Sequence, residues 1–359
     1  MFKIYQKFLL LEFLSKFIKI TLIFFSLIVI LSILEEVSFF KDSDKNFFYP
    51  IFLTFLSAPS ALIELFPFIV LLSTQFLIFS LVKNTELNLL KRNGMSNFKI
   101  IKLLFLFSFL IGLFTILIFY NFSSNMKFHY SNIKNNLSTD NKYLAMVTEN
   151  GIWIKDEINN NSLIIKAGQF QKNFLSNVII NQFNLDFNLI RTIQSDKIDI
   201  SNKKWILYNP IITANNIVDK NNEIMTLQSN FDNEKIINLF SDISTYDLID
   251  LFSLKEDFEK IGYSSDEIKS HLLRLSVTPI FYAILSVLSA TIMFSFNFNS
   301  SLILNILIGI SMSVSIYYIN YIFVSLGNNG KLPVTISIFF PLLVISLVTI
   351  IGLVNINEK

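Results

Sequence analysis

The chain has 359 residues, of which 52% are hydrophobic and 16% charged, and its mean hydropathy is +0.55. This composition is too apolar for an ordinary soluble protein, and several runs of about 20 apolar residues indicate an integral membrane protein. The net charge of +2 gives no indication of a nucleic-acid partner. The absence of cysteine excludes disulfides, thiol nucleophiles and cysteine metal sites, and the wide separation of His129 and His271 argues against a histidine-rich metal site.

Three membrane spans are predicted before a long polar insert, and three after it. Residues 1–19 carry four lysines around an apolar periodicity, which predicts an interfacial helix leading into the first span; the Lys and Arg bias places the N-terminus in the cytoplasm. The second span is expected to follow an interfacial segment that ends before Pro59, with a kink at Pro67. The second span is predicted to begin at about residue 62. The other five are predicted at about residues 17–34, 100–120, 272–296, 302–326 and 334–354.

A short basic segment joins the second and third spans. From about residue 84 to 97 it predicts a helix at the cytoplasmic face, with Thr85 as N-cap, Glu86 in the first turn and Gly94 as its stop. Such a small amphipathic helix indicates a docking element for another protein, although a solvated turn that only sets topology explains the same residues. The candidate docking residues are Thr85, Glu86, Leu87, Leu90, Lys91, Arg92 and Gly94.

Residues 121–270 form the polar insert, in which apolar and polar residues alternate with period two. The clearest alternation runs from Phe183 to Leu189 and predicts a strand with one buried face. Seven or eight short strands in all predict a β-sandwich or β-jellyroll, which the count of spans places outside the membrane, in the periplasm of a cell with two membranes. The other predicted strands are 143–147, 151–155, 163–167, 178–181, 197–200 and 205–208.

The sequence offers no catalytic constellation, so no catalytic residue and no metal site are predicted. Gly327-x-x-Gly330-Lys331 resembles a phosphate-binding loop only superficially, because the spacing is too short and no Ser or Thr follows the lysine. The adjacent Glu35 and Glu36 are typical of a membrane boundary rather than of an acid–base pair.

The predicted spans carry few ionisable residues. Glu64 and Arg274 lie near the outer ends of the second and fourth spans, where snorkelling to the interface explains a charge. No relay of Asp, Glu or His crosses the bilayer, as an ion-coupled transporter would require. A transporter without such a relay takes its energy from a partner, which favours the basic cytoplasmic segment as the point of contact.

The order of these features resembles the LptF/LptG permeases of the lipopolysaccharide exporter. Thr85-Glu86-Leu87 and Gly94-Met95-Ser96 are similar to the family's S/T-E-L…G-hydrophobic-S/T pattern between spans two and three. The stretch 151–156, Gly-Ile-Trp-Ile-Lys-Asp, resembles a strand typical of the LptG half. Further prolines, glycines and an arginine fit the same pattern: Pro59, Pro67, Arg274, Pro279, Gly327, Gly330, Pro333 and Pro341. The similarity covers essentially the whole chain.

The resemblance implies a helical membrane protein of six transmembrane helices, three on either side of a periplasmic β-jellyroll domain. The implied divisions are residues 1–120, 121–270 and 271–359. The chain would be one half of an ABC-type exporter that extracts lipopolysaccharide from the inner membrane and passes it to a periplasmic bridge. The implied partners are an LptF-like permease, an LptB-like ATPase dimer, an LptC-like membrane protein and an LptA-like bridge. ATP would be used by the ATPase, with no cofactor bound to this chain and both termini in the cytoplasm.

Two sets of candidate lipid contacts follow from the resemblance. Lys41 and Arg274 are candidate contacts for the lipid's phosphates, although family members carry more basic residues where this chain has Glu35 and Glu36. The candidate residues of the jellyroll lining or core are Trp153, Phe183, Leu185, Phe187 and Leu189, with plain domain core the more conservative interpretation. An LptF-type half, a lipoprotein-type permease and a membrane scaffold or sensor with a β domain are the alternatives.

Overall fold

The computed structural model describes residues 3–40, 48–137, 152–158, 161–171, 173–214, 217–219, 224–233, 235–236, 242–260, 264–295 and 302–357. The chain divides into two compact units. The helical unit comprises residues 1–127 and 266–359, and the β unit comprises residues 128–265. The strand predicted at 143–147 lies outside the described residues.

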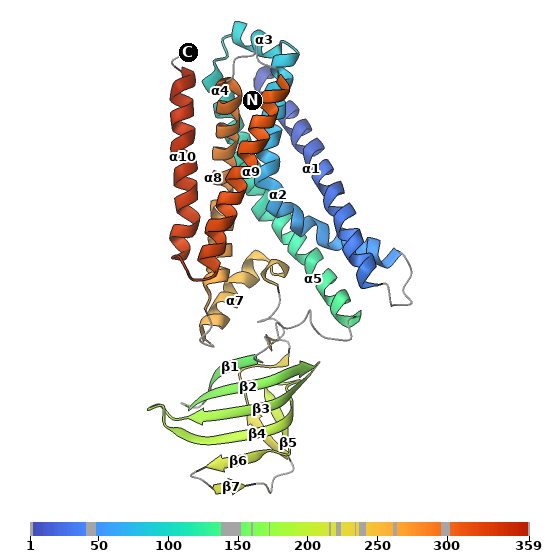
Figure 1. Cartoon of the computed structure of the whole chain (residues 1–359), viewed down its shortest axis with the longest axis vertical. Helices are drawn as coiled ribbons and strands as arrows, with labels where there is room; N and C mark the ends of the chain where they lie inside the picture. The colour runs from blue at the N-terminus through green and yellow to red at the C-terminus, as the bar shows by residue number, and fades with distance from the viewer. Residues whose placement is uncertain are drawn as a thin grey trace. The chain divides into compact units, whose positions relative to one another are not determined.

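Six helices of the described chain are long and apolar enough to cross a membrane, which confirms the predicted number of spans. The third is a continuous helical run from α4 to α5 (Figure 1), in which the π-helical segment η1 (Thr115–Tyr120) interrupts the α-helical geometry. The helices that form the six spans are α1 (Ile4–Phe39), α2 (Phe48–Lys83), α4 (Asn97–Phe114) with η1 and α5 (Asn121–Leu137), α8 (Asp266–Ser295), α9 (Leu302–Asn328) and α10 (Val334–Asn357).

The first two spans are longer than predicted. The expected interfacial helix and the first span form the single helix α1, whose 36 residues correspond to about 54 Å. The interfacial segment predicted before Pro59 and the second span form the single helix α2, which runs through both Pro59 and Pro67. Proline is tolerated inside a membrane helix where neighbouring helices and hydroxyl side chains satisfy the backbone, and Ser60 donates to the Ser57 carbonyl oxygen beside the first of these prolines.

The core of the helical unit lies along α2 and α8, the two spans that are most buried within the chain. Hydroxyl groups connect them: Thr74 Oγ1 donates to Ser286 Oγ at 3.2 Å, and Ser289 Oγ donates to the Leu71 carbonyl oxygen at 2.8 Å. Such hydrogen bonds hold helices together where no hydrophobic force does so. By contrast, only 6% of the residues in the most apolar stretch of α1, and 11% of those in the corresponding stretch of α9, are buried. The first and fifth spans therefore present most of their apolar surface outward.

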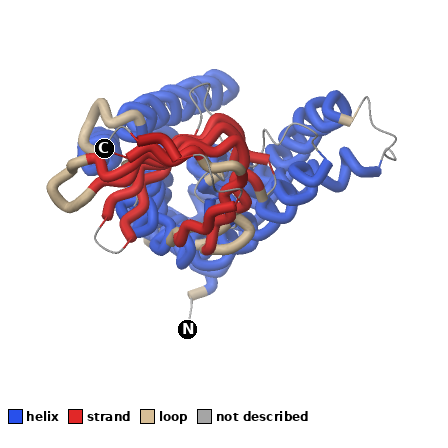
Figure 2. Tube along the Cα trace, turned by 90° about the horizontal axis from the view of Figure 1, so that it is seen from below, coloured by secondary structure: helices blue, strands red, loops and turns tan. Residues whose placement is uncertain are grey.

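The described residues of the β unit include an eight-stranded antiparallel sheet with the order β1-β2-β3-β4-β5-β8. Strand β6 pairs with β4, and β7 pairs with β6. The sheet curls rather than lying flat (Figures 1 and 2). This agrees with the number of strands and the jellyroll-like domain predicted. The strands are β1 (Ile152–Ile158), β2 (Asn161–Gln171), β3 (Phe174–Phe183), β4 (Leu189–Asp199), β5 (Lys204–Tyr208), β6 (Ile211–Ala214), β7 (Ile217–Asp219) and β8 (Ile224–Gln228).

The prediction of one strand from Phe183 to Leu189 is wrong. Strand β3 ends at Phe183 and β4 begins at Leu189, so the residues between them form the turn of a hairpin. Asn184 Oδ1 accepts the backbone N–H groups of Asp186 and Asn188, a side-chain interaction that favours a turn over a strand. Phe187 consequently adopts a left-handed backbone with φ of 57°.

The core of the β unit lies on the inner face of the curled sheet. Trp205 is fully buried there, and its Nε1–H donates to the Phe231 carbonyl oxygen at 2.7 Å. Trp153 is not a core residue, because its side chain is 47% exposed on the opposite face of β1, with Lys166 Nζ 5.1 Å from its ring centre. The inner-face residues buried with Trp205 include Ile152, Ile154, Leu163, Ile165, Leu175, Val178, Ile180, Ile193, Ile198 and Leu207.

Candidate functional site

The predicted docking helix forms, but it is shorter than expected. Helix α3 spans Glu86–Arg92 and lies between α2 and α4, at the end of the helical unit where α1 begins and α10 ends (Figure 1). Its acidic first turn and basic last turn both complement the helix dipole.

Two apolar side chains anchor α3 and the loop after it to the helical unit. Leu87 is 3% exposed and Met95 is 4% exposed, and both belong to a buried cluster to which α1, α2, α4 and α8 all contribute. Leu90 packs against the same cluster from its half-buried position. The apolar candidates Leu87 and Leu90 therefore attach α3 to its own chain, whereas Leu89 is 55% exposed.

The end of α3 is closed by a Schellman motif. The N–H of Met95 donates to the Leu90 carbonyl oxygen and the N–H of Gly94 to that of Lys91, with Gly94 in the left-handed region at φ of 79°. Ser96 Oγ then accepts the N–H of Lys99 and caps α4. The connection from α3 into the third span is consequently a hydrogen-bonded element rather than a loose loop.

The N-cap role predicted for the Thr85 side chain is wrong. Thr85 occupies the N-cap position, but its φ of 60° is left-handed, whereas a capping residue is normally extended. Its hydroxyl donates to the Asn84 carbonyl oxygen at 2.6 Å and does not accept an N–H of α3.

The outward face of α3 is basic with apolar side chains between the charges. Lys91 and Arg92 are exposed, Gly94 is exposed beside them, and Leu89 and Phe98 are each about half exposed. Arginine and aromatic side chains are enriched at protein interfaces, and Arg92 and Phe98 expose one of each here.

A second candidate site lies at the first turns of α8. Arg274 is half-buried, and its NH2 group lies 3.2 Å from Nδ1 of His271, whose Nε2 lies 2.8 Å from the Tyr120 hydroxyl. Tyr317 of α9 lies within electrostatic range of both Arg274 and Glu64. Tyr120 of the third span and Tyr317 of the fifth span therefore contribute to the polar environment of Arg274 on the fourth.

The other predicted phosphate contact, Lys41, lies outside the described residues. Of the two glutamates that precede it, Glu35 is exposed and Glu36 is 3% exposed. Sequence reasoning missed Tyr120 and His271 as neighbours of Arg274. The available signal was the spacing of His271 and Arg274, which at i and i+3 share a helix face.

The predicted jellyroll residues do not form one lining. Leu185, Phe187 and Leu189 are 72%, 68% and 55% exposed at the tip of the β3–β4 hairpin, and Phe183 is half-buried at the end of β3. The prediction that the three exposed residues belong to the core is thus wrong: the turn carries them out of the sheet's inner face.

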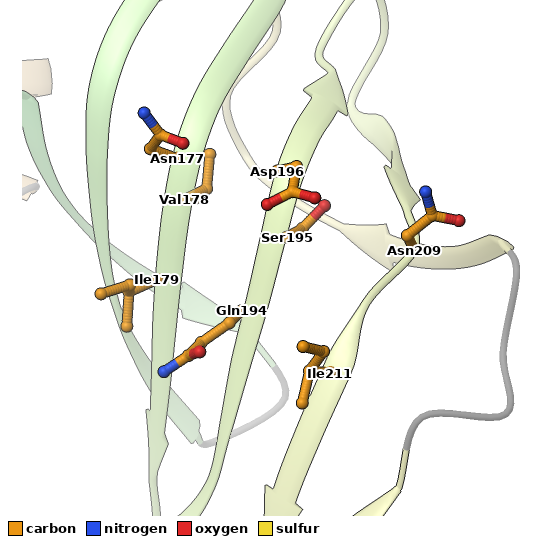
Figure 3. Close-up of a pocket in the computed structure, with 8 residues that line it drawn as sticks. All are labelled: Asn177, Val178, Ile179, Gln194, Ser195, Asp196, Asn209 and Ile211. Atoms are coloured by element: carbon orange, nitrogen blue, oxygen red, sulfur yellow. The ribbon is translucent and has the colours of Figure 1, made fainter.

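A pocket of about 220 Å³ opens where β5 and β6 diverge along β4 (Figure 3). Ser195 Oγ lies there, 2.7 Å from the Tyr208 carbonyl oxygen, and Asn177 and Asn209 adopt left-handed backbones. The pocket is smaller than the ~300–1,000 Å³ of ordinary ligand sites. Its geometry is accounted for by the branching of the sheet.

Six apolar helices, an inserted curled β sheet and an anchored, outward-basic connecting helix define a multi-pass membrane protein with an extramembrane β domain. The family model described as lipopolysaccharide export system permease LptF/LptG matches residues 7–355, and the chain belongs to this family. It is a multi-pass inner-membrane protein of the lipopolysaccharide export system. A comparison with individually curated proteins gives no match.

Proposed function

We propose that this chain is the LptG half of an ABC-type lipopolysaccharide exporter and that α3 receives the work of a separate ATPase. The observation that carries the proposal is the anchoring of α3 through Leu87 and Met95 into a core shared by four spans. A force applied to the outward face of α3 reaches α1, α2, α4 and α8 through that core. In this arrangement α3, both termini and the ATPase are cytoplasmic, and the β unit is periplasmic.

The energetics of the cargo require such a coupling. Each buried CH₂ group contributes about 0.8 kcal/mol to membrane affinity, so a lipid with several acyl chains costs tens of kcal/mol to remove into water. The chain has no nucleotide-binding loop of the required spacing. Both an apolar path and energy from another subunit are therefore needed.

The outward faces of α1 and α9 support pairing with a second permease. These spans bury little of their surface within the chain, and an LptF-like subunit placed against them would enclose an apolar cavity. The assignment to LptG rather than LptF rests on the stretch at 151–156. In the structure Trp153 lies on the outer face of β1 and Asp156 on the inner face. The residues of this stretch therefore contribute to both faces of the sheet.

The test is charge reversal on the exposed face of α3, with the double variant Lys91→Glu, Arg92→Glu in the complex with the paralogous permease and the ATPase. We expect the double variant to reduce ATPase association and lipopolysaccharide-dependent ATP hydrolysis. Lys331→Glu is the matched control, because Lys331 is also exposed but lies in the α9–α10 connection at the other end of the helical unit (Figure 1). Full ATPase association and hydrolysis in the double variant would overturn the proposed role of α3.

A further inference from the structure

Tyr120, His271 and Arg274 form a hydrogen-bonded series across two spans. The Tyr120 hydroxyl lies 2.8 Å from His271 Nε2, and Arg274 NH2 lies 3.2 Å from His271 Nδ1. Histidine thus stands between a phenol on the third span and a guanidinium on its own helix.

The chemistry of arginine fixes the state of the imidazole. A guanidinium can only donate hydrogen bonds, so Nδ1 of His271 must be the acceptor and carry no proton. The ring proton of the neutral imidazole is then on Nε2, from which it is donated to the Tyr120 oxygen. A doubly protonated imidazole would present an N–H to the guanidinium and break the series.

The packing of the third and fourth spans sets which of their residues lie side by side, including Tyr120 and His271. An ideal Cβ on Gly112 would lie 2.5 Å from Pro279 Cα, so the third and fourth spans touch through their backbones at that level. Tyr120 and His271 lie about two turns from this contact along their respective antiparallel helices. The π-helical segment η1 ends at Tyr120, and π-helical turns are often associated with functional sites.

We infer that His271, oriented by Tyr120, is a positioning residue for Arg274, presenting its guanidinium to a phosphate of the transported lipid. This inference rests on the proposed function, since it assigns the role of Arg274 in lipopolysaccharide binding. An arginine side chain has many rotamers, and an acceptor that holds it before the lipid arrives lowers the entropy lost on binding. His271 itself does not contact the lipid in this scheme.

The first test is spectroscopic and requires no transport. His129 and His271 are the two histidines of the chain, so full-length His129→Gln protein with ¹⁵N-labelled histidine in nanodiscs reports on His271 alone. We expect the neutral form protonated on Nε2, with Arg274→Ala shifting the Nδ1 resonance and Tyr120→Phe the Nε2 resonance. A proton on Nδ1, or an Nδ1 resonance unmoved by Arg274→Ala, would overturn the inference.

The second test is a double-mutant cycle on lipid binding, using the assembled complex with lipopolysaccharide and with its dephosphorylated form. His271→Ala is expected to weaken binding of the phosphorylated lipid about fivefold, the effect of one lost hydrogen bond, but to have no effect in an Arg274→Ala background. His271→Asn, which keeps an acceptor near the position of Nδ1, should restore part of the affinity. An equal loss in both backgrounds would show a purely structural role and overturn the inference.

The two tests separate the inference from the proposed function. A wild-type complex that binds no lipopolysaccharide would overturn the proposed function and, with it, the role of Arg274 at a phosphate. The labelled histidine would still decide whether His271 holds Arg274.

Discussion

Ser229 Oγ donates a 2.8 Å hydrogen bond to Asp156 Oδ2, joining the first strand of the sheet to the segment that follows the last strand. The backbone N–H and the side-chain amide of Asn230 donate to the same carboxylate at 3.0 and 2.8 Å. Asp156 is only 3% exposed, so these donors replace its hydration. Because β1 and β8 are at opposite ends of the pairing order, the three hydrogen bonds hold the curl of the sheet.

The first prediction concerns this carboxylate. Asp156→Ala removes the shared acceptor and leaves three donors without it, which should destabilise the β unit by about 3 kcal/mol. Both tryptophans of the chain lie in the β unit, so their fluorescence during urea unfolding of the full-length protein measures the change. Glu157→Ala, at the exposed neighbouring position, is the control and should change stability little. Equal midpoints for the two variants would contradict the closing role of Asp156.

The two tryptophans should differ sharply. Trp205→Phe loses the hydrogen bond to the Phe231 carbonyl oxygen and opens a cavity, with an expected cost of about 2–4 kcal/mol. Trp153→Phe should cost at most about 1 kcal/mol, the range of its interaction with Lys166. Acrylamide quenching checks the same assignment, because Trp153 should be accessible and Trp205 protected. Protection of both would indicate that another surface covers Trp153.

Phe187 should be replaceable without loss of stability. Its left-handed backbone costs an L-residue about 1–2 kcal/mol, and its side chain is 68% exposed, so Phe187→Gly should leave the β unit unchanged or about 1 kcal/mol more stable. Ile180→Ala, at a fully buried position of the same hairpin, should cost about 2–5 kcal/mol. Urea midpoints measure both. Strong destabilisation by Phe187→Gly would contradict this prediction and indicate that the Phe187 side chain belongs to the core.

Gly94 offers a test of the proposed coupling between α3 and the ATPase, with Gly330 as the control position in the same chain. Gly94 and Gly330 both have positive φ, and an added Cβ would meet nothing within 4 Å at either position. Alanine should therefore cost about 1 kcal/mol of conformational strain at each. In the assembled complex, Gly94→Ala is expected to reduce lipopolysaccharide-stimulated ATP hydrolysis, whereas Gly330→Ala should not. Equal hydrolysis in the two variants would contradict a role for the end of α3 in coupling.

Gly112→Ala should disturb the packing of the third and fourth spans. Its Cβ would approach the backbone of Pro279 to 2.5 Å, which no side-chain rotation can relieve. We expect about 2–3 kcal/mol of destabilisation, seen as a lower thermal midpoint of the purified protein in detergent. Gly352→Ala is the milder comparison, because its Cβ would meet only the Thr291 side chain, at 3.1 Å. A midpoint equal to that of Gly352→Ala would show that the helices can separate at Gly112 without cost.

Much of the architecture could be predicted from local features of the sequence. Six spans, the strand-rich insert and the stop at Gly94 follow from apolar length, alternation and glycine geometry, all of which are local properties. The strand predicted through Phe187 failed because alternation alone cannot distinguish a strand from a turn whose Asn184 side chain binds the backbone. The continuity of α2 through Pro59 and Pro67 was not predicted, because it depends on tertiary contacts and hydroxyl groups that sustain a proline-containing helix in a membrane.

The sequence by itself determined the membrane class, the 3+3 arrangement of spans around a β insert and the presence of a short basic connecting helix, because the lengths and periods of these elements are set by the bilayer and by backbone geometry. Only the tertiary structure decided that Leu87 and Met95 anchor that helix, that Asp156 closes the sheet, and that His271 stands between Tyr120 and Arg274. Apart from the i, i+3 pair of His271 and Arg274, these contacts join side chains that are far apart in the sequence and meet only on folding, so no local pattern predicts them.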